Sequence, residues 1–134
     1  MTDRFREELE LVRRSYAEIQ NGENWVLIPN YRLPPNRFNL TTTPVLFVVP
    51  VGYPNTGPDN FFVDANLRLH DNAAPPAFNA NANSSTGPAP IPGNWGWFSW
   101  HPSTWRPAAN SAAGDNLLTF LIGVGVCLRG EESA

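Results

Sequence analysis

Ser99 and His101 are the residues of this 134-residue chain whose types and spacing best suit catalysis. A serine hydroxyl is a poor nucleophile unless an adjacent base takes its proton, and histidine, with an unperturbed pKa of about 6.5, accepts a proton near neutral pH. In an extended stretch, residues two apart point to the same face, so this hydroxyl and this imidazole can meet. We expect an acyl-transfer site with Ser99 as nucleophile and His101 as base. The simpler alternative is that both are ordinary loop residues in an aromatic-rich hairpin.

Two other residues are weaker candidates for the same chemistry. Cys127 is the only cysteine, but it stands near the end of an apolar run, a position typical of a buried and unreactive thiol. His70 precedes Asp71 and could act with it as a base, although a surface-turn histidine is the expected reading. One cysteine excludes an internal disulfide and a multi-cysteine metal site, and we expect neither a metal nor a cofactor.

An oxyanion formed during acyl transfer needs a hydrogen-bond donor. Candidates are Asn94, Arg106 and the backbone amides near Ser99. Tryptophan is enriched where partners dock, and Trp97 and Trp100 are the expected contributors to such a surface.

The aromatic cluster around Ser99 is the most unusual feature of the composition. Trp25 and Trp105 are expected to belong mainly to the core, and one of Trp95, Trp97 and Trp100 is expected to be exposed. The cluster consists of Trp95, Trp97, Phe98, Trp100 and Trp105.

Length and charge limit the classes of protein that this chain can be. Residues 1–134, with 42% hydrophobic content, are expected to form one domain with a real core. The charged fraction is only 16% and the net charge of -3 has no block of like charges behind it, which argues against nucleic-acid binding. The charged N-terminus lacks the apolar run of a secretory signal, and no stretch is long enough to span a bilayer. We expect a cytosolic protein that does not bind membranes.

The two ends of the chain have helical patterns. From Asp3 to Gln20, apolar residues recur at steps of four and three, which predicts one amphipathic helix that Asn21-Gly22 closes. An apolar run over 117–128 predicts a buried final helix with Asp115 as its N-cap, and a strand is the lesser alternative because the run contains two glycines.

The middle of the chain is predicted to be an antiparallel meander followed by a long loop. Its strands are expected at Trp25–Ile28, Pro44–Val49 and Phe61–Val63, which are β-branched or aromatic and bounded by prolines and asparagines. Residues 71–94 are rich in proline, asparagine and alanine, and the composition predicts a loop at a functional site or a tolerated insertion.

Three short motifs resemble the ubiquitin-conjugating-enzyme family in type and in their order along the chain. Tyr53-Pro54, followed by Pro58 and Phe61, is similar to the family's tyrosine-proline motif at the end of its third strand. Trp105-Arg106-Pro107 is similar to its tryptophan-x-proline element, and the segment 97–101 that leads into it resembles a divergent bacterial branch. The resemblance covers residues 3–128 in element order but only about two dozen positions in actual motif.

The resemblance implies an α+β fold of the ubiquitin-conjugating type: an N-terminal helix, an antiparallel meander, a long active-site loop segment and a C-terminal helix. It also implies a bacterial carrier that receives the C-terminal carboxyl group of a ubiquitin-like modifier from an activating enzyme and passes it to a target. In that branch such proteins are associated with an activating enzyme, a modifier and a metallopeptidase. The first helix would contact the activating enzyme, through arginines that are otherwise simply solvated: Arg4, Arg6, Arg13 and Arg14.

The chain departs from the family's pattern at the catalytic position. The histidine-proline-asparagine tripeptide is missing upstream of it, and His101-Pro102-Ser103 lies downstream instead. No cysteine precedes Trp105-Arg106-Pro107, where the family's nucleophile would stand. Either an ester on Ser99 replaces the usual thioester, or the protein is a non-catalytic scaffold that binds the modifier or its activating enzyme. A third hypothesis, an unrelated carbohydrate- or peptide-binding domain built on the tryptophans, predicts no first helix.

Overall fold

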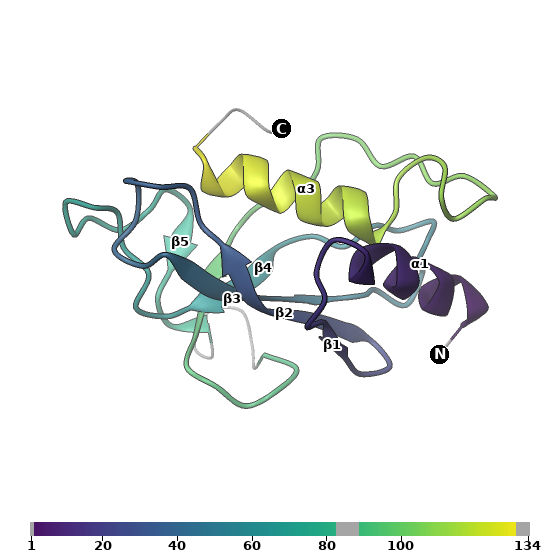
Figure 1. Cartoon of the computed structure of the whole chain (residues 1–134), viewed down its shortest axis with the longest axis horizontal. Helices are drawn as coiled ribbons and strands as arrows, with labels where there is room; N and C mark the ends of the chain where they lie inside the picture. Colours follow the sequence, from purple (N-terminus) through teal and green to yellow (C-terminus); the bar gives the residue numbers. More distant parts are fainter. Residues whose placement is uncertain (1, 83–88, 131–134) are drawn as a thin grey trace.

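A six-stranded antiparallel sheet carries helices α1 and α3 on one of its faces (Figure 1). The computed structural model describes residues 2–82 and 89–130. The strand order is β1-β2-β3-β4-β6-β5, and every paired neighbour is antiparallel. The predicted α+β arrangement is confirmed and is consistent with the ubiquitin-conjugating fold.

Helix α1, Asp3–Arg13, is shorter than the sequence pattern predicts. Thr2 caps it by accepting a hydrogen bond from the Phe5 amide at 3.1 Å. The prediction that the helix continues to Gln20 is wrong. Tyr16 and Ile19 keep the helical spacing and do pack against the core, but from a turn and a connecting segment. Apolar spacing alone does not distinguish these arrangements.

The residues after α1 begin the sheet instead. Strand β1, Gln20–Asn21, pairs with Val26 and Leu27, so Asn21-Gly22 leads into a hairpin turn and does not close a helix. The Gly22 amide donates to the Trp25 carbonyl at 3.0 Å across that turn. A Cβ atom on Gly22 would lie 2.2 Å from the Trp25 ring, which explains why glycine stands there.

The three predicted strands are confirmed, with longer bounds for each. They are β2, Trp25–Arg32; β3, Thr42–Val48; and β4, Phe61–Asp64. Two further strands complete the sheet: β5, Phe78–Asn79, and β6, Trp95–Phe98.

Alternation along the strands divides the core between the two faces of the sheet. Val45 and Phe47 of β3 face the helices, whereas Leu46 between them belongs to a smaller cluster on the other face. This second cluster gathers Leu46, Phe62, Ala82 and Trp95, with Trp25, Leu27, Ala89, Ile91 and Trp97 packed against it.

The described residues of the segment 71–94 lie mostly in turns and irregular chain, as predicted, except for β5. Residues 83–88 of that predicted loop lie outside the described residues. Ala82 and Ile91 contribute to the second cluster, so the described ends of this segment cover the sheet face that lacks helices.

Helix α3, Leu117–Leu128, confirms the predicted final helix. Its N-cap is Asn116, so the expectation of Asp115 in that role is wrong. The Asn116 side chain accepts from the Thr119 amide, and the Thr119 hydroxyl accepts from the Asn116 amide, which forms a capping box. The Asp115 carboxylate accepts from the Arg106 amide at 2.7 Å and from the Thr119 hydroxyl at 3.1 Å. Within the described ranges, no helix is long and apolar enough to cross a membrane.

Candidate functional site

The tyrosine-proline and tryptophan-x-proline motifs, about fifty residues apart in the sequence, meet directly in space. The Trp105 indole donates a hydrogen bond to the Pro54 carbonyl at 2.7 Å, and the rings of Tyr53 and Trp105 lie with their centroids 6.0 Å apart. A Cβ atom on Gly57 would come within 2.4 Å of the Trp105 ring, so the loop packs flat against the indole only because that residue is glycine. The contact fixes the C-terminal end of the segment that carries Ser99 and His101.

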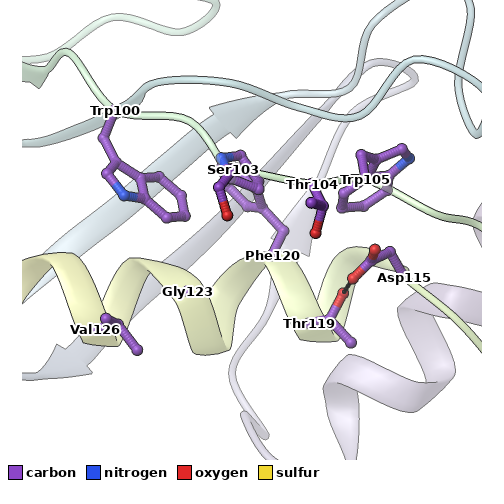
Figure 2. Close-up of a pocket in the computed structure, with 10 residues that line it drawn as sticks. Trp100, Ser103, Thr104, Trp105, Asp115, Thr119, Phe120, Gly123 and Val126 are labelled. Atoms are coloured by element: carbon purple, nitrogen blue, oxygen red, sulfur yellow. Dashed lines mark hydrogen bonds between the residues drawn. The ribbon is translucent and has the colours of Figure 1, made fainter. Parts of the chain in front are cut away.

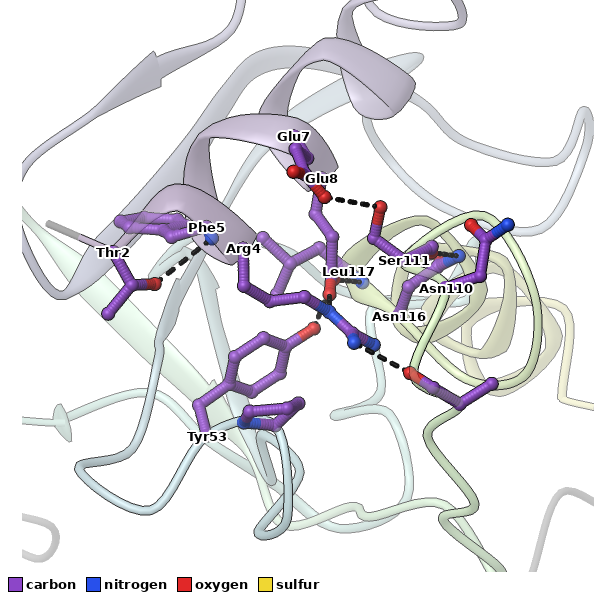
Figure 3. A network of polar contacts seen from close by, with 12 residues as sticks. Thr2, Arg4, Phe5, Glu7, Glu8, Tyr53, Asn110, Ser111, Asn116 and Leu117 are labelled. Carbon is purple, nitrogen blue, oxygen red and sulfur yellow. Dashed lines mark hydrogen bonds and ion pairs between the residues drawn. The ribbon is translucent and has the colours of Figure 1, made fainter.

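Glu8 of α1 is a buried carboxylate that links the contact between the two motifs to α1 and α3 (Figure 3). Its side chain is 0% exposed and accepts hydrogen bonds from the Tyr53 hydroxyl and from the Leu117 amide, the latter at 2.7 Å. Leu117 is the first residue of α3, where backbone amides lack helical partners and a negative charge is stabilised. One side chain therefore joins α1, the tyrosine-proline loop and the start of α3.

Arg4 completes the network and makes Glu8 tolerable inside the protein. It pairs with Glu8 through its Nε atom and donates from Nη1 to the Ala108 carbonyl at 2.6 Å. A buried charge is stable only when it is paired and hydrogen-bonded. Arg4 is therefore committed to an internal role and is only 17% exposed, whereas the arginines at 6, 13 and 14 remain on the surface.

Burial of Tyr53 in this network also changes its titration. Desolvation raises the pKa of the phenol well above its usual value, and its hydrogen bond to Glu8 raises it further. Tyr53 is consequently a fixed hydrogen-bond donor, which suits a structural role.

Trp100 anchors the other end of the candidate segment as the chain leaves β6. Its amide donates a hydrogen bond to the Asn60 side-chain oxygen at 3.1 Å. Its ring packs near Phe61 and Phe120, with centroids 6.0 and 5.6 Å away. A Cβ atom on Gly123 would lie 2.7 Å from the ring, so α3 approaches Trp100 closely. Trp100, which we expected to contribute to a partner-binding surface, is therefore mostly buried in the core.

Two hollows flank the segment, and Trp100 lines both. The first, of about 210 Å³, lies between residues 102–105 and α3. Figure 2 shows the hydroxyl groups of Ser103 and Thr104 directed toward α3, beside the Asp115–Thr119 hydrogen bond. The second hollow, of about 230 Å³, is lined by Ser99, by residues 75–77 and by the C-terminal end of α3.

Ser99 and His101 are both exposed, and Ser99 follows directly on the end of β6. The Ser99 amide donates to the Ala77 carbonyl at 3.0 Å, which holds the serine at the rim of the second hollow. No hydrogen bond joins Ser99 to His101, both of which lie in the described part of the chain. Their side chains are neighbours in sequence and accessible, but the structure does not bring them together as a formed dyad.

Cys127 lines the same hollow as Ser99, a proximity that the sequence did not predict. The thiol is half-buried in α3 and packs against the core. Burial raises the pKa of Cys127 to about 11, and the nearby Arg37 guanidinium offsets only part of this increase. Because the thiolate is the reactive form, Cys127 is a poor nucleophile at neutral pH.

The remaining predicted site residues lie in three different surroundings. Asn94 is exposed at the opposite end of β6 from Ser99, about 16 Å away at the usual rise per residue, so the two side chains are not brought together. Trp97 is half-buried in the second cluster, on the sheet face that lacks helices. The Arg106 side chain is exposed, while its backbone exchanges hydrogen bonds with Asp115.

None of the tryptophans, all of which the structure describes, is exposed, whereas His70 is. Trp25 and Trp105 are half-buried and pack against the two clusters. Trp95 and Trp100 are buried and Trp97 half-buried, so the expectation that one of these three is exposed is wrong. His70 is exposed in a turn, as predicted.

A sequence model of the prokaryotic E2 family E matches residues 2–130. The chain belongs to this family. No curated protein and no solved structure gives a significant match. The predicted resemblance is confirmed, and with it an E2-like conjugating role in general, which involves a modifier and an activating enzyme.

Glu8 is the residue of this family E chain that sequence reasoning missed. It stands three residues after Phe5 and four before Val12, on the apolar stripe of α1, and acidic residues are almost never fully buried unless paired. An acidic residue on an apolar stripe was therefore the available signal. Arg4, one turn earlier, is the i,i+4 partner that such a residue needs.

Proposed function

We propose that this E2 family E chain accepts the C-terminal carboxyl group of a ubiquitin-like modifier as an ester on Ser99 and passes it to a nucleophile on a target. The observation that carries the proposal is the absence of a cysteine between β6 and Trp105 in a member of a conjugating family. The chain's one thiol has a raised pKa in α3. Ser99 is the first exposed hydroxyl after β6.

In the proposed step the Ser99 hydroxyl oxygen attacks the carbonyl carbon of the activated modifier while His101 takes the hydroxyl proton. The bond from that carbon to the activating enzyme's leaving group breaks, and the leaving group recovers a proton. His101 would have to turn toward Ser99, which its exposure permits, and catalytic hydrogen bonds often form only in the reacting complex. The modifier's tail would reach Ser99 across the second hollow.

The Glu8 network supports the same proposal from the other side. It fixes Trp105 and the start of α3 by buried hydrogen bonds, while the Ser99 amide is held by the Ala77 carbonyl, so the segment from Ser99 to Trp105 is anchored at both ends. A nucleophile on a segment anchored in this way is pre-positioned for an incoming carboxyl group.

A non-catalytic scaffold is the second candidate function. The observation in its favour is that Ser99 and His101, both described, share no hydrogen bond. Such a scaffold would bind the modifier or the activating enzyme without covalent chemistry.

The test is to incubate the protein with its activating enzyme, modifier and ATP and to measure intact mass. We expect an adduct of one modifier that hydroxylamine removes and that is lost in Ser99→Ala. His101→Ala should slow its formation by about 10²–10⁴-fold, whereas Cys127→Ala and Ser103→Ala should form it normally. An adduct that disappears with Cys127→Ala, or no adduct at all with a charged activating enzyme, contradicts the proposal.

A further inference from the structure

The chain contains no lysine. Lysine and arginine together number nine, and all nine positions are arginines. They are Arg4, Arg6, Arg13, Arg14, Arg32, Arg37, Arg68, Arg106 and Arg129. None of these 134 residues therefore carries a primary amine on its side chain.

Contacts that require a guanidinium explain why some, but not all, of the nine basic residues are arginines. Three arginines use the fork or plane of the guanidinium. Arg4 contacts Glu8 and Ala108 through two different nitrogens. Arg37 donates from Nε to a carbonyl and lies over Phe38, and the guanidinium of Arg68 lies over Phe78. Lysine could not replace them without loss.

Other arginines make contacts that lysine makes equally well. Arg6 and Arg13 each form a single exposed ion pair within α1, with Asp3 and Glu10. A shortage of adenine-rich codons is a poor explanation as well, because asparagine, whose codons begin with the same two bases as those of lysine, is abundant in the chain.

A carrier of an activated carboxyl group has a specific reason to lack lysine. A deprotonated lysine amine attacks an ester carbonyl, and the bond from the carbonyl carbon to the serine oxygen breaks. The new amide keeps one of the two N–H protons, and the other ends on the serine oxygen, which is released as a hydroxyl. A lysine on the carrier itself would face the ester at an effective concentration in the millimolar range. Against a target at micromolar concentration, it would have roughly a thousandfold advantage. The guanidinium of arginine stays protonated and does not compete.

We propose that the absence of lysine protects the charged chain from capturing its own modifier. This inference rests on the proposed ester at Ser99. It adds a reason for the lysine-free composition.

A lysine placed beside Ser99 tests the inference. Pro76 is exposed and lines the same hollow as Ser99, next to the Ala77 carbonyl that accepts from the Ser99 amide. Gln20 is an exposed residue in β1, at the opposite edge of the sheet and about 19 Å from β6 at the usual strand spacing. Pro76→Lys and Gln20→Lys each add one amine and one positive charge, so they form a matched pair.

The variants are charged with activating enzyme, modifier and ATP at pH 9, where more of the lysine is deprotonated, and the adducts are followed by intact mass before and after hydroxylamine. We expect Pro76→Lys to accumulate a hydroxylamine-resistant amide at least tenfold faster than wild type or Gln20→Lys. Because amide formation frees Ser99, a second modifier should then add to the same chain.

The outcomes separate this inference from the function on which it rests. If wild type forms the ester but the Pro76→Lys adduct stays as hydroxylamine-sensitive as wild type, the protective role of the missing lysines is refuted and the ester proposal stands. If Gln20→Lys reacts as fast as Pro76→Lys, proximity to Ser99 is not the cause and the inference fails. If no protein forms an ester, the proposed function falls and the inference falls with it.

Discussion

Replacement of Glu8 by alanine should destabilise the protein far more than replacement of an exposed acidic residue of α1. The carboxylate is fully buried and accepts from Tyr53, Leu117 and Arg4. Glu8→Ala leaves the Leu117 amide and the Tyr53 hydroxyl without their acceptor and removes the partner of a mostly buried guanidinium.

The size of the effect follows from these contacts. Removal of one partner of a buried ion pair costs about 3–5 kcal/mol. Arg4 keeps 17% exposure and its hydrogen bond to Ala108, so part of that penalty is relieved by solvent and we expect about 3 kcal/mol. Domains of this kind are stable by only about 5–15 kcal/mol, so the variant should lie close to the limit of folding.

The assay is urea unfolding followed by tryptophan fluorescence, with Glu10→Ala as the matched control. Glu10 is an acidic residue of the same helix, but its ion pair with Arg13 is exposed, and its loss should cost less than about 1 kcal/mol. Tyr53→Phe should cost about 1.5–3 kcal/mol and should cost less in a Glu8→Ala background, because the two residues share one hydrogen bond. If Glu8→Ala is no more destabilising than Glu10→Ala, the network does not hold the motifs together and the reasoning is refuted.

Three further predictions concern the surroundings of the candidate segment. Because burial raises the pKa of Cys127 from 9.0 to about 11, iodoacetamide at pH 8 should alkylate it about 100-fold more slowly in the native protein than in urea; equal rates would contradict its burial. Gly123→Ala should lower stability by about 1–3 kcal/mol because the new methyl group meets the Trp100 ring at 2.7 Å, whereas a gain in melting temperature would show that the ring yields freely. Burial raises the pKa values of Tyr53 and Tyr31, so the unfolded state loses their protons first as the pH rises above 10. The free energy of unfolding should be constant below pH 10 and should fall above it by up to about 1.4 kcal/mol per pH unit for each tyrosine. Urea unfolding across this range should show a smaller slope in Tyr53→Phe.

Local signals in the sequence were sufficient for most of the fold. The meander and α3 were predictable because β-branched runs bounded by prolines, and one long apolar run, each encode an element by themselves. The family resemblance was predictable because prolines and a tryptophan at Tyr53-Pro54 and Trp105-Arg106-Pro107 stand in order, and in space these motifs form one packed unit.

The features that the sequence did not predict depend on contacts between distant segments. Tyr16 continues the helical spacing, yet it stacks on Tyr31 at 5.6 Å after the helix has ended, and no local pattern distinguishes the two situations. The same holds for Cys127, which lies far from Ser99 in sequence but lines the same hollow because α3 packs back over the sheet.

The most direct test of the central claim is to change the chemistry of the bond at Ser99 without removing the nucleophile. Ser99→Cys, compared with Ser103→Cys in a Cys127→Ala background, is charged with modifier and then treated with dithiothreitol. An ester on Ser99 predicts that the wild-type adduct resists dithiothreitol, that Ser99→Cys forms an adduct which dithiothreitol cleaves as a thioester, and that Ser103→Cys retains the resistant ester. A thiol-sensitive adduct on Ser103→Cys, or a resistant adduct that persists on Ser99→Cys, would place the acyl group on another residue and contradict the account.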